Sequence, residues 1–189
     1  QGFLGDDSRV PGVRAIPGAG TKVPLYILGS STFGAQLAAH LGLPYGFASH
    51  FAPEALTQAV DVYRRGFQPS EQATEPWVIA GVNVIVAPTE REAAEELNHA
   101  TRSRVAALLA PGRKLSDAEL DSVMSSPGGR QVASMMRYTA SGTPDTVKTY
   151  LDDFQQHANA DELIVVPASR SVENRLQSLE LLAQVSRLG

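Results

Sequence analysis

The hydrophobic residues of this chain form short unbroken runs, and the segments between the runs have apolar residues at helical spacing. Unbroken apolar runs of this length, bounded by Gly, Pro or polar residues, are typical of strands that are buried on both faces. Four such runs predict strands at residues 23–29, 45–50, 77–87 and 162–167. Buried strands that alternate with helices predict a parallel sheet covered by helices.

The predicted helices begin at residues that cap helices well. Ser30, Ser31 and Thr32 precede the first helix, and Thr89 and Ser116 each precede a Glu by three residues, which is the pattern of a capping box. Residues 1–22 are predicted to be a loop or linker, and Gly128-Gly129 a turn. The expected helices cover residues 33–41, 53–66, 89–109, a short segment from 116, 132–137, a segment from 143, and a segment from 171.

Four strand–helix units are compatible with two folds. A complete (β/α)8 barrel takes about 250 residues, so this chain of 189 residues would supply half of a barrel, with extra helices before the last strand. The half barrel would have two open strand edges that something else must cover. An open doubly wound sheet is the competing arrangement.

Composition excludes several classes of function. The chain has 16 Lys and Arg, 20 Asp and Glu and no Cys, which gives a formal net charge of −4. This balance argues against a nucleic-acid binder held by bulk charge, and the absence of Cys excludes thiolate nucleophiles and Cys-ligated metals. The His residues have no metal-ligand spacing, so no metal site is expected. We expect neither a signal peptide nor a membrane span, and therefore a cytoplasmic location.

The segment from Leu28 to Gly34 is the strongest candidate for a ligand site. Gly29 ends a predicted strand, and Ser30, Ser31 and Thr32 lead into a helix. The start of a helix offers free N–H groups and partial positive charge, which suit a phosphate, and the hydroxyls add further donors. The alternative is an ordinary helix cap with additional hydroxyls.

A second candidate group follows the second strand. Ser49, His50 and Phe51 lie at its carboxyl end, where parallel α/β folds bind ligands. His50 has the chemistry to shuttle a proton or bond a ring carbonyl, and Phe51 to stack on a flat ring. A polar loop at the mouth of the sheet is the alternative. Arg170, after the last strand, has the charge to contact an anion, although a surface position is the more common role for Arg.

Several segments resemble the bacterial luciferase-like flavin monooxygenases. The resemblance is carried by residues 23–31 with the small residues that follow them, by residues 45–53, and by Gly142-Thr143-Pro144 with residues 161–164. Members of this family are (β/α)8 barrels that use reduced FMN, or in some cases a deazaflavin, with dioxygen to oxidise aldehydes or other small organic molecules. The resemblance covers about residues 20–188 and matches only strands five to eight of the barrel.

The resemblance implies roles for the two candidate groups. Gly29, Ser30, Ser31 and Thr32 would hold the flavin phosphate, and Ser49, His50 and Phe51 would face the flavin ring or the mouth of the substrate site. It implies reduced FMN as cosubstrate, with a deazaflavin less favoured, a flavin reductase as its source, and the amino-terminal half of the same protein or a second subunit as partner. No catalytic residue is assigned, and oligomer formation is expected.

Two alternatives stay open at this point. The first is a non-catalytic flavin-binding protein on a reduced barrel, which would bind flavin without turnover. The second is a half barrel that pairs with itself or with a partner and has no ligand role.

Overall fold

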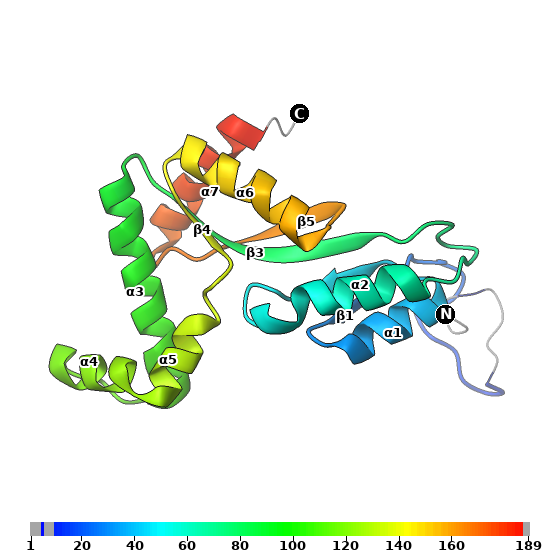
Figure 1. Ribbon diagram of the computed structural model, residues 1–189. Coiled ribbons are helices and arrows are strands. Elements are labelled where there is room, and N and C mark those ends of the chain that lie inside the picture. The colour runs from blue at the N-terminus through cyan, green and yellow to red at the C-terminus, as the bar shows by residue number, and fades with distance from the viewer. Residues whose placement is uncertain (1–4, 6–9, 187–189) are drawn as a thin grey trace.

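The computed structural model describes residues 5 and 10–186, and its short strands alternate with helices as the hydrophobic pattern predicts (Figure 1). The strands among these residues are β1 (Ile27–Gly29), β2 (Tyr45–Phe47), β3 (Val78–Val86), β4 (Thr139–Gly142) and β5 (Glu162–Pro167). The helices are α1 (Thr32–Leu41), the 3-10 helix η1 (Pro53–Ala55), α2 (Leu56–Gly66), α3 (Glu90–Leu109), α4 (Asp117–Ser125), α5 (Pro127–Ser134), α6 (Pro144–Ala158) and α7 (Val172–Ser186).

The long strand β3 organises a sheet whose strand pairs are all parallel. β1 pairs with β2, and β2 pairs with the first residues of β3. Asn83 and Val84 of β3 pair with both β4 and β5, so these two strands lie on opposite edges of β3, and β2 and β4 share an edge. β1 and β5 do not pair with each other, which leaves the sheet open within the described residues.

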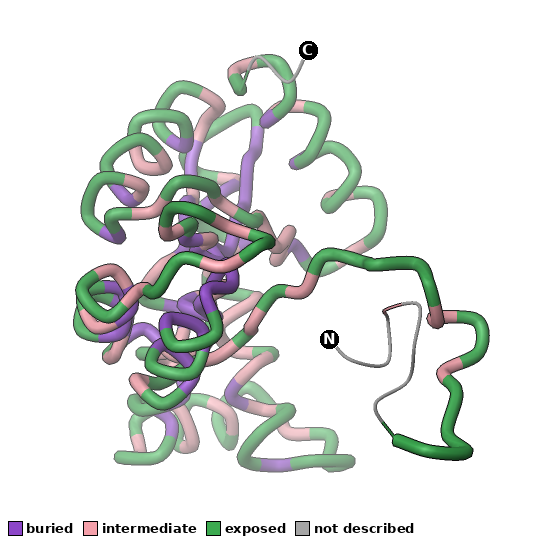
Figure 2. Tube along the Cα trace, turned by 90° about the vertical axis from the view of Figure 1, so that its right-hand side faces the viewer, coloured by how far each residue is buried: buried purple, intermediate pink, exposed green. Residues whose placement is uncertain are grey.

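One face of the sheet carries the hydrophobic core. Residues that pair in register point to the same face, so Tyr45 and Phe47 of β2 share this face with Val78 and Ala80 of β3. Buried side chains of α1, α2, α6 and α7 pack against them. Figure 2 shows the buried residues gathered inside the layer of helices.

The opposite face of the sheet is poorly covered at its amino-terminal end. Leu28 of β1 is in register with Gly46, and Gly46 with Ile79, so these residues share a face. Leu28 is 76% exposed, and Ile164 of β5, which is in register with Gly81 on the same face, is 58% exposed. We call this surface, formed by Leu28, Ile79 and Ile164, the bare face.

Helices α3, α4 and α5 pack together as a lobe, with α3 beside β3 and β4 and α5 leading into the amino end of β4 (Figure 1). Their starts follow the predicted caps. The Thr89 hydroxyl accepts a hydrogen bond from the N–H of Glu92, and Ser116 and Glu119 form the complete capping box that the sequence predicts. Arg102 of α3 forms ion pairs with Asp117 and Asp121 of α4, which tie the two helices together.

Two parts of the predicted element list are wrong. The structure has a fifth described strand, Thr139–Gly142, which was not predicted because its four residues include no run of large apolar side chains. The helix expected at 132–137 instead begins at Pro127, where Ser126 caps it by accepting from the N–H of Gly129. Gly128 and Gly129, expected to form a turn, lie in the first turn of this helix.

Two predicted strands are shorter than expected. Residues 23–26 do not join the sheet: Leu25 forms two hydrogen bonds with the side-chain amide of Gln72, at 2.9 and 2.7 Å, in place of bonds to a strand. β2 ends at Phe47 because the chain turns there, and Ala52 N donates to Ala48 O. Residues 10–22 form no helix or strand, and residues 1–4 and 6–9 of the loop expected over residues 1–22 lie outside the described residues.

Candidate functional site

The two predicted ligand groups lie side by side at the carboxyl edge of the sheet. Gly29 at the end of β1 is in register with Phe47 at the end of β2. The N–H of Ala48 donates to the carbonyl oxygen of Gly29 at 2.9 Å, which joins the two loops. The fold therefore brings the Ser30–Thr32 segment next to the segment that holds Ser49, His50 and Phe51.

The first backbone N–H groups of α1 have no hydrogen-bond partner within the helix. Ser31 is the N-cap residue, with an extended backbone, but its side chain makes no capping hydrogen bond. The first intrahelical bond runs from the N–H of Ala35 to the carbonyl oxygen of Ser31. The N–H groups of the preceding turn therefore lack intrahelical partners. Ser30 and Ser31 are exposed and Thr32 is half-buried, so three hydroxyls border these N–H groups.

Close packing beneath this segment holds α1 against the sheet. A side chain on Gly29 would contact the Tyr45 hydroxyl at 3.4 Å and the Cα of Gly34 at 3.5 Å. The two glycines thus let the helix start and the strand end approach closely. The Tyr45 hydroxyl donates to the carbonyl oxygen of Ser31 at 3.0 Å, which fixes the position of the N-cap residue. This arrangement holds the hydroxyl-rich turn in place without using its N–H groups.

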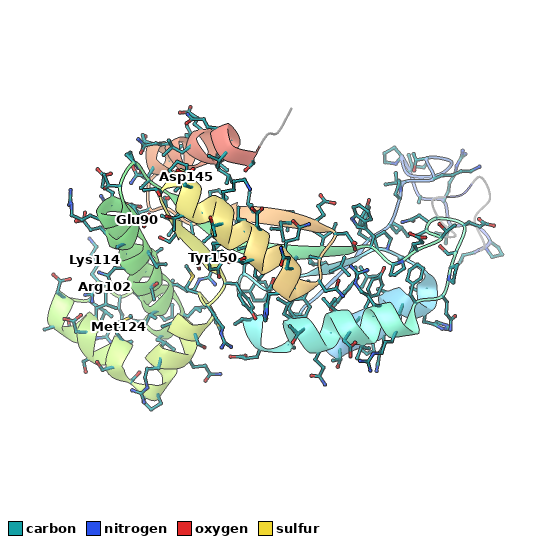
Figure 3. All side chains as sticks on the ribbon, turned by 45° about the horizontal axis from the view of Figure 1, so that its top comes forward. Glu90, Arg102, Lys114, Met124, Asp145 and Tyr150 are labelled. Atoms are coloured by element: carbon teal, nitrogen blue, oxygen red, sulfur yellow. The ribbon has the colours of Figure 1, made fainter. Side chains whose placement is uncertain are left out.

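Helices α3, α4, α5 and α7 use a polar residue at their start for capping, whereas Thr143 at the start of α6 makes no side-chain capping hydrogen bond. Ser126 caps α5, and the Ser171 hydroxyl accepts from the N–H of Asn174 at the start of α7. The start of α6 is capped from a different helix: the Glu90 carboxylate accepts from the N–H of Thr143 at 3.1 Å. Figure 3 shows Glu90 at the end of α3 that lies near Asp145 of α6. Hydrogen bonds from the Thr146 hydroxyl and from Thr143 lower the pKa of Glu90, which keeps this cap charged.

Ser49 and His50 differ in whether their side-chain polar atoms have hydrogen-bond partners. The Ser49 side chain is fully buried, and its hydroxyl donates to the carbonyl oxygen of Gly81 at 2.5 Å, so it anchors the loop to β3. The His50 ring lies over Gly81, where a Cβ would come within 2.5 Å of His50 Nδ1. That Nδ1 is buried and has no hydrogen-bond partner among the described residues.

The environment of His50 favours its neutral form. Burial lowers the pKa of His50, and the positive charge of Arg104 lowers it further. Phe51 packs edge-on against the His50 ring, with 4.9 Å between ring centroids, and is itself 43% exposed. A neutral imidazole beside an exposed aromatic ring is suited to contact a flat or polar ligand at this edge.

The sequence reasoning missed two residues near this edge, Asn83 and Arg104. Asn83 is buried in β3, and its amide N–H donates to the carbonyl oxygen of His50 at 2.8 Å. Its signal was present, because it is a polar residue inside an otherwise apolar run. Arg104 sits on the long helix α3, where sequence alone gives no indication of its proximity to His50. Arg170, considered as an anion contact, forms an ion pair with Glu96 at 2.9 Å.

The described residues contain neither a membrane-spanning helix nor a metal-binding cluster. None of the helices described for residues 10–186 is long and apolar enough to cross a membrane. The same part of the chain brings together no group of three His, Cys, Asp or Glu residues able to hold a metal ion.

Known proteins resemble this chain over most of its length. A family model described as luciferase-like monooxygenase matches residues 3–159. The Bacillus subtilis (strain 168) protein YddN is 40% identical over 194 residues, which cover 97% of this chain and 55% of YddN. The luciferase-like monooxygenase of Escherichia coli (strain K12) is 51% identical over 83 residues, 44% of this chain and 25% of that protein.

A solved structure shares the fold over nearly the whole chain. The crystal structure of apo-MsnO8 matches with a TM-score of 0.74 and 31% identity, over 97% of this chain and 56% of that one. The chain thus spans about half the length of the curated relative YddN and of MsnO8. The match of the family model to most of the sequence, together with these relatives, shows that the chain belongs to the luciferase-like monooxygenase family.

Proposed function

We propose that this chain is the carboxyl-terminal half of the barrel of an FMN-dependent monooxygenase that oxidises an aldehyde or a similar small organic substrate with dioxygen. The observation that carries the proposal is the start of α1. Its three hydroxyl residues, of which Ser30 and Ser31 are exposed, and its uncapped N–H groups lie at the carboxyl edge of a parallel sheet, where α/β folds bind ligands.

The open sheet supports the half-barrel part of the proposal. β1 and β5 each pair on one side only within the described residues, and the bare face exposes Leu28 and Ile164. Unpaired strand edges and a large apolar surface are costly in water. In the proposed enzyme, residues 23–189 form strands five to eight, and the amino-terminal half of the same protein, or a second subunit, pairs with these edges and covers the bare face.

The residues at the start of α1 fit a flavin phosphate. The Ser30, Ser31 and Thr32 hydroxyls and the adjacent N–H groups would donate to its oxygens, and the two glycines beneath hold the start of α1 close to the end of β1. His50 and Phe51 line the neighbouring mouth, where the neutral imidazole contacts the flavin ring or the substrate. Ser49 contributes by anchoring this loop to Gly81.

The chemistry divides between cofactor and protein. Reduced FMN, when bound, supplies the electrons for activating dioxygen. The residues of this chain orient the cofactor by its phosphate, hold the substrate beside it and exclude water from the mouth. A flavin reductase supplies the reduced FMN. A deazaflavin in place of FMN is the less favoured form of the proposal.

The phosphate contact is tested by comparing FMN with riboflavin, which lacks the phosphate. We expect FMN to bind this chain at least about tenfold more tightly, and Ser31→Ala combined with Thr32→Ala to remove most of that difference, because hydrogen bonds to a charged group contribute about 1.5–3 kcal/mol each. Ser126→Ala, which removes a hydroxyl that caps α5, is the matched control and should leave FMN binding unchanged. Equal binding of FMN and riboflavin would contradict the proposed phosphate site.

The activity is tested by adding the missing half. The chain is mixed with the portion of YddN that it does not cover, and substrate-dependent oxygen consumption is measured with reduced FMN and, in a parallel sample, with a reduced deazaflavin. We expect aldehyde oxidation with FMN in the mixture only. Flavin binding without turnover in the mixture would favour the non-catalytic flavin-binding protein instead.

A further inference from the structure

A cavity of about 320 Å³ lies between α3 and the carboxyl-terminal parts of β3 and β5. This cavity is separate from the start of α1. The start of α1 follows β1, His50 follows β2 and the cavity lies at β3 and β5, so His50 lies between the two sites along the sheet. Met136, Val166 and Ala168 give it apolar walls. Its polar lining includes Asn83, Arg104, Ser169 and Arg170.

Asn83, which lines this cavity, has an unsatisfied buried acceptor. Its side chain is 1% exposed, and the amide nitrogen donates to the carbonyl oxygen of His50 at 2.8 Å. That carbonyl needs a donor, so the nitrogen must face it and the amide oxygen must face away. Asn83 Oδ1 has no hydrogen-bond partner within residues 10–186. A buried acceptor left unpaired destabilises the structure, so a ligand that donates to it is favoured.

Of the two arginines that line the cavity, Arg104 is the one that no carboxylate balances. Arg170 also lines the cavity, but Glu96, which is buried, pairs with its guanidinium at 2.9 Å and accepts from its backbone N–H at 3.0 Å. Arg104 is half-buried and forms no ion pair with the described residues, whereas Arg102 on the same helix pairs with two carboxylates. A guanidinium binds a carboxylate well because its donors match both carboxylate oxygens.

We propose that this cavity binds a small organic acid, with Arg104 holding its carboxylate and Asn83 Oδ1 accepting a hydrogen bond from a hydroxyl or N–H group of the same molecule. The inference deepens the proposed function, on which it rests, by naming the substrate class: the molecule oxidised beside the flavin carries a carboxylate. The apolar walls contact its carbon chain, and His50, whose carbonyl is bound by Asn83, lies between the acid and the cofactor.

The charge balance favours a carboxylate over a phosphate. A phosphate dianion would place two negative charges against one unbalanced guanidinium, close to the Glu96 carboxylate that already neutralises Arg170. A monovalent carboxylate matches the single free positive charge. The start of α1, with no carboxylate among its neighbouring hydroxyls, remains the better phosphate site.

The test is calorimetric titration of the chain with hydroxy acids of three to six carbons, at neutral pH and fixed ionic strength. Each acid is compared with the diol of equal length, which lacks the charge, and with the parent acid, which lacks the hydroxyl. We expect the best hydroxy acid to bind about tenfold or more tightly than either, because each comparison removes one hydrogen-bonded contact. Binding of acid and diol with equal affinity would overturn the proposal.

Substitutions at Arg104 test whether the acid binds in this cavity. Arg104→Gln should abolish the preference for acid over diol, and Arg104→Lys should restore part of it by restoring the charge. Arg91→Gln is the matched control, because Arg91 lies on the exposed side of the same helix and pairs only with Glu95 within the described residues; it should bind the acids like the parent chain. A preference that survives Arg104→Gln would overturn the proposal.

Two further arms separate this inference from the proposed function. The inference would be overturned if inorganic phosphate bound more tightly than the hydroxy acids. It would also be overturned if Arg104→Gln lost the preference for FMN over riboflavin. Either result would assign the cavity to a phosphate. Acid binding that fails while FMN binding is intact overturns the inference alone. FMN binding that fails while the acids bind as expected overturns the proposed function and leaves the acid site standing.

Discussion

The two faces of the sheet differ in how completely helices cover them. On the covered face, Tyr45, Phe47, Val82 and Val84 are all at most 1% exposed beneath four helices. On the bare face, Leu28 is 76% exposed although it belongs to the same sheet. Both faces are apolar in sequence, so hydrophobicity alone does not distinguish them. The difference teaches that this sequence is patterned for burial on two faces, while the helices described here cover one.

The carboxyl end of the bare face is an exception that bears on function. There the Ser49 hydroxyl donates to the carbonyl oxygen of Gly81, the Asn83 amide donates to that of His50, and Ile85 is fully buried. Polar side chains on this side gather at the edge where ligands bind in parallel sheets. The bare face thus passes from exposed apolar residues at its amino end to a polar site at its carboxyl end.

The largest expected effect lies on the covered face. Phe47→Ala removes a side chain that is 1% exposed and in contact with Tyr45, and we expect it to lower the free energy of unfolding by about 3–5 kcal/mol. Urea unfolding followed by circular dichroism measures the change. Leu37→Ala, at a side chain that is 39% exposed on α1, is the control and should cost much less. Equal losses would mean that Phe47 is not packed in the core as described.

Alkaline pH should weaken the covered face next. Burial raises the pKa of Tyr45 to about 12. Unfolding exposes the phenol and returns its pKa to about 10, so the folded state keeps a proton that the unfolded state releases. The stabilisation is complete below pH 10 and is lost as the pH rises toward 12, by about 2 kcal/mol for this residue.

The alkaline effect is assigned to Tyr45 by comparing urea unfolding of the parent chain and of Tyr45→Phe at pH 8 and at successive values above 10. The variant should lose less stability over that range, although burial also raises the pKa of Tyr63 and Tyr150, which leaves it some dependence. Identical slopes for both proteins would show that Tyr45 does not contribute.

Most of the fold could be predicted from local signals. The apolar run of β3 and the capping residues of α3 and α4 located these elements to within one residue or two. Thr139–Gly142 was missed because a strand of four residues that pairs only with the end of β3 has no pattern of its own. Residues 23–26 look like a strand, but a distant residue, Gln72, binds their backbone.

The candidate site was predictable where it is contiguous in sequence. Gly29 to Thr32 and Ser49 to Phe51 each form one segment, and the parallel order of β1 and β2 places the segments together. That the Ser49 hydroxyl is committed to Gly81 depends on packing between strands, which no local pattern records. Arg104 approaches His50 from a helix more than fifty residues later, so the cavity it lines could not be predicted from spacing.

Leu163 and Ile164 are neighbours on β5, and their side chains point to opposite faces of the sheet. Leu163 of β5 points to the covered face, where it packs against the core although it is only half-buried. Leu163→Ala should lower the free energy of unfolding by about 1–2 kcal/mol, below the 2–5 kcal/mol of a fully buried leucine, because part of the side chain is already in water. Urea unfolding measures it. A loss as large as that of Phe47→Ala would mean that the edge strand is more deeply packed than described.

The smallest effect is expected one residue later. Ile164 points to the bare face and is 58% exposed, so Ile164→Thr, which keeps the branched side chain suited to a strand, should change the free energy of unfolding by no more than about 0.5 kcal/mol. The same substitution should become costly once the uncovered portion of YddN is added, because the proposed barrel closes over this side chain. The measurement is urea unfolding of the parent chain and the variant, each with and without that portion. If the cost stays near zero in the mixture, the bare face is not the interior of a barrel and the half-barrel proposal fails. If the cost is already large in the chain alone, Ile164 is buried by a contact within the chain, and the contrast between the two faces is smaller than the exposed fractions indicate.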